Sequence, residues 1–109
     1  MNYQWHYDML IFTRKGRKRE EGMYYEKHHI LPKSMGGSDD ESNLVYLTAR
    51  EHFLAHWLLW RIHKNRDTAF AFHTFVSLSK KNSNYSNFSS KGYKEAREAY
   101  SEKHRERLS

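Results

Sequence analysis

The chain has 109 residues, enough for one domain, and it contains no cysteine. This composition excludes disulfide bonds and thiolate metal ligands, and no apolar run approaches the roughly 20 residues that span a bilayer. With 19 basic and 13 acidic residues the formal net charge is +6, which favours an acidic partner. No charged-then-apolar leader opens the sequence, so we expect a cytoplasmic protein that does not bind a membrane.

The N-terminal residues predict a short amphipathic helix over residues 3–13, followed by a basic loop. The apolar positions of this helix fall at spacings of four, three and one: Tyr3, Tyr7, Leu10 and Ile11. Five cations follow within six residues: Arg14, Lys15, Arg17, Lys18 and Arg19. Such a run can follow a phosphate backbone, but taken alone it is more typical of a solvated loop.

The centre of the chain predicts two short strands joined by a long loop. Residues 23–31 are rich in aromatic and apolar side chains and end at Pro32, which suits a strand. Residues 33–43 are rich in glycine, serine and acidic residues, which is typical of a turn-rich connection. Residues 44–47 are the second strand candidate.

Two helices are expected after the strands. Thr48 and Glu51 form a capping box for a helix that should run to about Asn65. Asp67 can cap a further helix from about 68 to 79. We expect this helix to be largely buried because of its apolar side chains, namely Phe70, Phe72, Phe75, Val76 and Leu78. Residues 81–90 predict a polar loop, and residues 91–107 predict a charged helix.

The histidines are the most informative residues of the chain. His52 and His56 lie four residues apart on a predicted helix, so both imidazoles can converge on one ion. His28 and His29 are neighbours on a strand and point to opposite faces, so they cannot be equivalent ligands. A hairpin followed by a helix can bring His28 against the helical pair, which gives three ligands and an open position, as in catalytic metal sites. His29 is then free to act as a general base.

A third of the chain, about residues 24–58, carries several of these features in a characteristic order. The pattern consists of Glu26-Lys27-His28-His29-Ile30-Leu31-Pro32, Gly36-Gly37, Asn43-Leu44, and Glu51-His52-Phe53 through His56. It resembles the HNH nuclease motif of ββα-metal endonucleases, a family that includes phage and intron-encoded homing endonucleases and colicin DNases. The resemblance implies a ββα-metal hairpin-helix motif inside a mostly helical α+β domain.

The resemblance also implies roles for individual residues. His28, His52 and His56 would bind one divalent ion, either Mg²⁺, Mn²⁺ or Zn²⁺. His29 would activate the attacking water, and Asn43 would brace the long loop. Glu26 lies two residues before His28 on the same strand face, and it is expected to orient the His28 ring or to hold an arginine near the phosphate.

The implied organisation is a single HNH nuclease domain over residues 1–109. It would consist of an N-terminal helix and basic loop (1–22), a ββα-metal core (23–65) and C-terminal helices (66–109). DNA contacts are expected from the basic run and from further cations of the core: Arg14, Lys15, Arg17, Lys18, Arg19, Lys33, Arg50 and Arg61.

The leading hypothesis is therefore a metal-dependent endonuclease that hydrolyses DNA phosphodiester bonds in a bacterial or phage-infected cell, as phage homing endonucleases do. One alternative is a nucleic-acid-binding protein with a structural or vestigial metal site, which would bind DNA in a salt-sensitive way without turnover. Another is an RNase or a toxin-like nonspecific nuclease. The sequence leaves open whether the chain acts alone, as a homodimer or with a larger protein partner.

Overall fold

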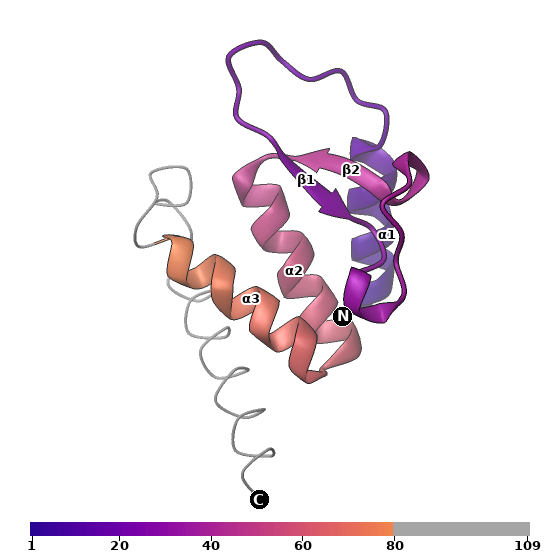
Figure 1. Ribbon diagram of the computed structural model, residues 1–109, viewed down its shortest axis with the longest axis vertical. Coiled ribbons are helices and arrows are strands. Elements are labelled where there is room, and N and C mark those ends of the chain that lie inside the picture. The colour runs from indigo at the N-terminus through magenta and orange to yellow at the C-terminus, as the bar shows by residue number, and fades with distance from the viewer. Residues whose placement is uncertain (80–109) are drawn as a thin grey trace, which may run out of the picture.

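The computed structural model describes residues 1–79, in which a helix, a β-hairpin and two further helices follow one another (Figure 1). The elements are α1 (Tyr3–Arg14), β1 (Glu26–His29), β2 (Leu44–Leu47), α2 (Ala49–His63) and α3 (Arg66–Ser79), with two short 3-10 helices in the loop between the strands, Lys33–Met35 and Glu41–Asn43. This is the α+β fold that the sequence predicts, and the loop and helix expected over 81–90 and 91–107 lie outside the described residues. Within residues 1–79, no helix is both long and apolar enough to cross a membrane.

The two strands form an antiparallel pair in which Glu26 lies opposite Leu47 and His28 opposite Val45. The first strand is shorter than the predicted span of 23–31, because β2 offers only four residues as partners. Side chains alternate between the two faces, so His28, Val45 and Leu47 are buried whereas Tyr46 is exposed. The buried face of the hairpin packs on α1 and α2.

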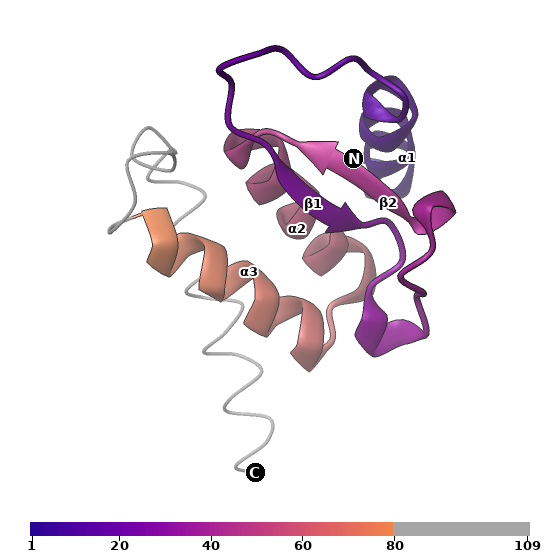
Figure 2. The same cartoon turned by 45° about the horizontal axis from the view of Figure 1, so that its top comes forward.

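Helix α2 lies between α1 and α3 in both views and belongs to two hydrophobic clusters (Figures 1 and 2). The first cluster joins α1, β2 and α2 through Tyr7, Leu10, Ile11, Val45, Leu47, Ala55, Leu58 and Leu59. The second joins α2 to α3 through Trp60, Ala69, Phe72 and Val76. Because α2 carries residues of both clusters, its position is fixed from two sides.

Helix α3 differs from its prediction in two respects. It begins at Arg66, and the side-chain oxygen of Asn65 accepts the backbone N–H of Thr68 at 2.9 Å. The prediction of Asp67 as the cap is therefore wrong, although an acidic residue in the first turn still complements the helix dipole. Phe70 is 61% exposed, because it lies about 200° around the helix from the buried Phe72.

The predicted capping box is present at the start of α2, and Glu51 also anchors the basic loop. The Thr48 hydroxyl accepts the Glu51 backbone N–H, and the Glu51 carboxylate accepts the Thr48 N–H at 2.9 Å. The same carboxylate accepts bonds from Arg14 Nε at 2.8 Å and from both terminal nitrogens of Arg17 at 2.6 and 2.9 Å. Glu51 thus joins the end of α1, the basic loop and the first turn of α2.

These contacts determine the protonation of Glu51. Partial burial would raise the pKa of its carboxyl group, but the bonds from Arg17, Thr48 and Arg14 prevail and lower it to about 2. A depressed carboxyl pKa stabilises the folded state above the unfolded value and loses that contribution as the pH falls towards the folded value. Glu51 is therefore ionised in the folded chain at neutral pH.

We expect Glu51→Ala to lower the free energy of unfolding by about 2 kcal/mol, because it removes a helix cap and leaves two arginines without their shared partner. Glu51→Gln keeps a capping oxygen and should lose less. Urea unfolding should show that the difference in free energy of unfolding between wild type and Glu51→Gln decreases as the pH falls from 4.5 towards 2. This is the range between the ordinary pKa of Glu51 and its pKa in the folded chain. Glu21→Ala, at an exposed position, is the control and should leave the free energy of unfolding unchanged. Equal stability of the Glu51 and Glu21 variants would contradict this assignment.

Candidate metal centre

Three histidine side chains converge between the hairpin and α2. His28 comes from β1, and His52 and His56 come from successive turns of α2. One ring nitrogen from each lies within 4.8 Å of the others, and the ring centroids are 4.9–5.0 Å apart. This is the only such group of three potential ligands in residues 1–79. The structure thus brings together the three histidines that the sequence singles out.

Burial keeps these imidazoles neutral. It lowers the pKa of His28 to about 2 and that of His56 to about 3, with further contributions from neighbouring histidines. Burial also lowers the pKa of His52, although the carboxylate of Glu26 opposes this effect. Neutral imidazoles at neutral pH carry lone pairs that can bind a cation. Three nitrogen donors of this kind fit a divalent metal ion.

Glu26 holds one of the three rings. Its carboxylate accepts a hydrogen bond from His52 Nδ1 at 2.8 Å, which leaves Nε2 of His52 to face the other histidines. The sequence predicts that Glu26 orients His28 or holds an arginine, whereas the structure pairs it with His52. Glu26 and His28 do share a strand face, but α2 packs against that face and brings His52 within reach.

Tyr7 of α1 is a contact of the site that the sequence does not indicate. Its hydroxyl lies 2.9 Å from His28 Nε2 and donates to the carbonyl oxygen of Ile30 at 2.6 Å. Burial, with a smaller effect of the Asp8 charge, raises the pKa of Tyr7, so the hydroxyl keeps its proton. The helical periodicity identifies Tyr7 only as a core residue, and the 21 positions that separate it from His28 hide the contact.

Helix α3 closes the apolar side of the cluster. The Phe75 ring stacks on His56 with centroids 4.6 Å apart and approaches His52 edge-on at 4.4 Å. The predicted burial of Phe75 is thus partly met, because its side chain is half-buried against the two rings. An apolar wall of this kind restricts the entry of water and strengthens electrostatic interactions within the site.

His29 lies beside the cluster but does not belong to it. Its side chain is 26% exposed, and Nε2 lies 2.8 Å from Oδ1 of Asp39, whose Oδ2 accepts from Lys33 Nζ at 2.9 Å. Hydrogen bonds from Lys33 and His29 lower the pKa of Asp39 to about 2. Asp39 is therefore the acceptor, and Nε2 of His29 donates the hydrogen of this contact.

Asn43 makes the contacts that a bracing residue requires. Its side-chain oxygen accepts the Leu31 N–H at 2.8 Å, and its amide nitrogen donates to the carbonyl oxygens of Leu31 at 3.0 Å and Ser38 at 2.8 Å. The loop also approaches itself at Gly37, where a Cβ would lie 1.8 Å from the Leu31 carbonyl oxygen. Asn43 thus ties the two ends of the loop together, and the absence of a side chain at Gly37 permits the close approach to Leu31.

Comparisons with known proteins agree with this geometry. A family model described as HNH endonuclease matches residues 13–50, which include His28, His29 and Asn43. The protein of Enterobacteria phage T4 described as "Probable mobile endonuclease D" is 43% identical over 109 residues, covering 95% of this chain and 42% of that protein. "Probable mobile endonuclease E" of the same phage is 51% identical over 72 residues, covering 66% of this chain and 50% of that protein.

The chain carries an HNH endonuclease motif over residues 13–50. It spans half or less of the length of the two phage relatives described above. No solved structure matches the chain.

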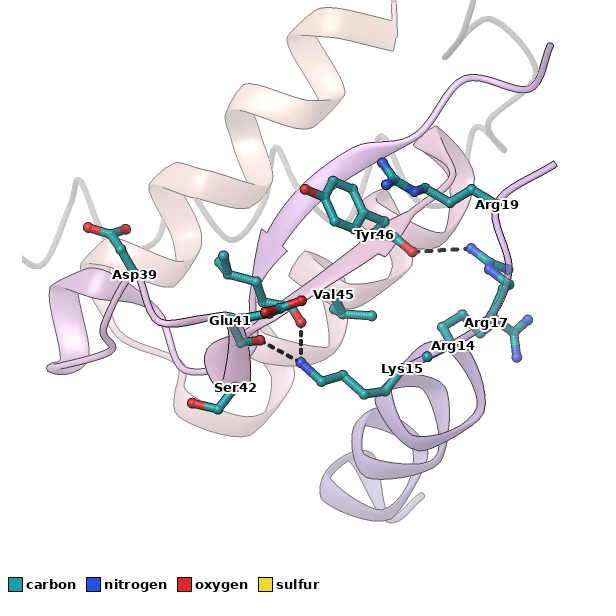
Figure 3. Close-up of a pocket in the computed structure, with 11 residues that line it drawn as sticks. Arg14, Lys15, Arg17, Arg19, Asp39, Glu41, Ser42, Val45 and Tyr46 are labelled. Atoms are coloured by element: carbon teal, nitrogen blue, oxygen red, sulfur yellow. Dashed lines mark hydrogen bonds between the residues drawn. The ribbon is translucent and has the colours of Figure 1, made fainter. Parts of the chain in front are cut away.

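Four cations of the basic run line a groove of about 780 Å³ between the end of α1 and β2 (Figure 3), namely Arg14, Lys15, Arg17 and Arg19. Lys15 Nζ donates to the carbonyl oxygens of Glu41, at 2.7 Å, and Leu44. Arg17 donates to the carbonyl oxygen of Tyr46 at 3.3 Å as well as to Glu51. Lys15 and Arg17 therefore fasten the loop after α1 to the hairpin.

The other cations predicted to contact DNA lie in varied surroundings. Arg19 is exposed and stacks its guanidinium 4.1 Å from the centroid of the Tyr46 ring. Arg61 is half-buried, donates to the Tyr3 hydroxyl at 2.7 Å and stacks on the same ring. Arg14 pairs with Glu51. The remaining three are exposed: Lys18, Lys33 and Arg50. The DNA contacts of all eight cations stay predictions, and the exposed positions are the most accessible to a phosphate.

We expect Glu26→Gln to weaken metal binding by about 10–100-fold, because a neutral amide holds the His52 ring less firmly than a carboxylate. Calorimetric titration of the full chain with Zn²⁺ measures this change. Glu41→Gln, which alters an exposed carboxylate, is the matched control and should bind as wild type does. Equal affinities for wild type and Glu26→Gln would show that Glu26 does not support the ligand.

Proposed function

We propose that this chain is a metal-dependent endonuclease that hydrolyses DNA phosphodiester bonds, as a homing-type enzyme of a phage. The observation that carries the proposal is the cluster of His28, His52 and His56, with His29 beside it on the opposite strand face. Three ligands and an open position are typical of catalytic metal sites. The names of the phage T4 relatives, both described as probable mobile endonucleases, support the same activity.

A phosphodiester resists hydrolysis because its negative charge repels nucleophiles and its alkoxide leaving group is poor. A divalent ion bound at the histidines would supply positive charge to the phosphate and to the leaving oxygen. The three imidazoles would hold this charge between β1 and α2, where the Phe75 ring packs against His52 and His56. Imidazole ligands suit Zn²⁺ better than Mg²⁺ or Mn²⁺, which prefer oxygen ligands.

His29 is proposed as the general base. Asp39 accepts the hydrogen of Nε2, so Nδ1 is the nitrogen that takes a proton from the attacking water. The negative charge of Asp39 then stabilises the imidazolium that forms. Lys33 holds the other oxygen of Asp39, which keeps the carboxylate in place for this contact.

Contact with DNA is proposed to depend mainly on the exposed cations. Lys18, Arg19 and Arg50 are exposed, whereas Arg14 and Arg17 share the carboxylate of Glu51. Cations of this kind bind the phosphate backbone without reading the base sequence. The proposal therefore assigns backbone affinity to these residues and no base recognition.

Plasmid nicking tests the function. We expect the purified chain to nick supercoiled DNA with Mn²⁺, Mg²⁺ or Zn²⁺ and not with EDTA. His29→Ala should lower the rate by about 10²–10⁴-fold while metal and DNA binding persist, because only the proton acceptor is lost. His52→Ala should lose metal binding as well.

The control variant is His6→Ala, which alters an exposed histidine of α1 and should cleave normally. DNA binding without nicking under every metal would instead favour a nucleic-acid-binding protein with a vestigial site. Undiminished cleavage by His29→Ala would refute the assignment of the base. Faster cleavage of RNA than of DNA would move the substrate from DNA to RNA.

A further inference from the structure

A side chain outside the matched HNH region reaches the candidate metal centre. Tyr7 lies in the middle of α1, before residue 13, where the family match begins. It is only 4% exposed and packs in the same cluster as Leu10 and Ile11. Its hydroxyl is in hydrogen-bond distance of two groups, His28 Nε2 at 2.9 Å and the Ile30 carbonyl oxygen at 2.6 Å.

The Tyr7 hydroxyl has only one proton to donate, and this fixes the direction of its two hydrogen bonds. A carbonyl oxygen only accepts, so the single hydroxyl proton of Tyr7 goes to Ile30. The hydroxyl can then only accept from His28, which requires that Nε2 carry the hydrogen. A neutral imidazole has one N–H, so the lone pair of His28 resides on Nδ1.

We propose that Tyr7 is a positioning residue that fixes the tautomer and ring orientation of His28, so that Nδ1 is the nitrogen that binds the metal. This inference deepens the proposed function, since it rests on the same metal site. In this proposal Tyr7 does for His28 what Glu26 does for His52. Glu26 accepts from Nδ1 of His52, which leaves Nε2 of His52 as the ligand. The two histidines thus bind through different nitrogens, each selected by a partner on the far side of its ring.

The hydrogen bonds of the Tyr7 hydroxyl also connect His28 to the backbone that follows β1. Ile30 directly follows His29, and its own N–H donates to the carbonyl oxygen of Asn43 at 2.8 Å. The Tyr7 hydroxyl therefore connects α1, the metal ligand and the point where the long loop leaves the hairpin. A ring without the hydroxyl would fill the same space but leave His28 free to exchange tautomers.

The test is Tyr7→Phe in the full chain, which retains the buried ring. Tyr3→Phe is the matched control, because it also removes a hydroxyl from α1. The Tyr3 hydroxyl accepts a hydrogen bond from Arg61 and not from the histidines. Calorimetry with Zn²⁺ should show about a 10–100-fold loss of affinity for Tyr7→Phe and wild-type affinity for Tyr3→Phe. Thermal unfolding without metal checks that both variants remain folded.

A second readout separates positioning from stability. Nitrogen-detected NMR of metal-free wild type should show His28 protonated at Nε2, and Tyr7→Phe should show a mixture of tautomers. Unchanged tautomer and unchanged Zn²⁺ affinity in Tyr7→Phe would overturn the inference. Failure of wild type to bind any of Zn²⁺, Mn²⁺ and Mg²⁺ would overturn the proposed metal site itself. That measurement does not involve Tyr7 variants, so the two failures can be distinguished.

Discussion

The structure depends on the packing of β1 against α2, which places three neutral imidazoles in a largely buried contact. A buried polar nitrogen without a partner destabilises the fold, so each ring needs hydrogen bonds that surface histidines do not need. The fold supplies Tyr7 for His28 and Glu26 for His52. The remaining lone pairs then face one another, an arrangement that a bound cation would stabilise. The requirement for partners on the outer sides of the His28 and His52 rings thus links the stability of the fold to the proposed metal site.

Helix α1 belongs to this functional unit, although it lies mostly outside the matched HNH region. Tyr7 contacts the proposed metal ligand His28 from the middle of the helix, and Arg14 contacts Glu51 from its end. Glu51 precedes His52 directly, so the arginine contact holds the turn from which the first helical ligand projects. The two contacts lie about two helical turns apart and fix α1 against both the hairpin and α2. Helix α1 therefore supplies contacts to the site that the matched motif alone does not contain.

Sequence patterns predict those features that depend on local geometry. The capping box fixes the start of α2, the spacing of His52 and His56 fixes their shared face, and the adjacency of His28 and His29 places them on opposite strand faces. Patterns fail where a side chain reaches across the fold. The partner of Glu26 depends on how α2 crosses the strand, and Tyr7 is recognisable in the sequence only as a core position. Asn65 and Asp67 are both good caps, so sequence alone does not decide where α3 begins.

The basic run carries a high formal charge, but several of its cations already have partners within the fold and are less available to a ligand. Its cations suggest a phosphate-binding surface, yet Arg14 and Arg17 share one carboxylate and Lys15 donates to two backbone carbonyls. Each of these contacts lowers the positive potential and restrains the side chain that would have to follow a phosphate. A cation that already stabilises the fold releases fewer counterions when DNA binds than a solvated one, so the run contributes less to salt-dependent affinity than its length implies. Arg14 and Arg17 influence the site through structure instead, because they hold Glu51 and with it the helix that carries two of the three proposed metal ligands.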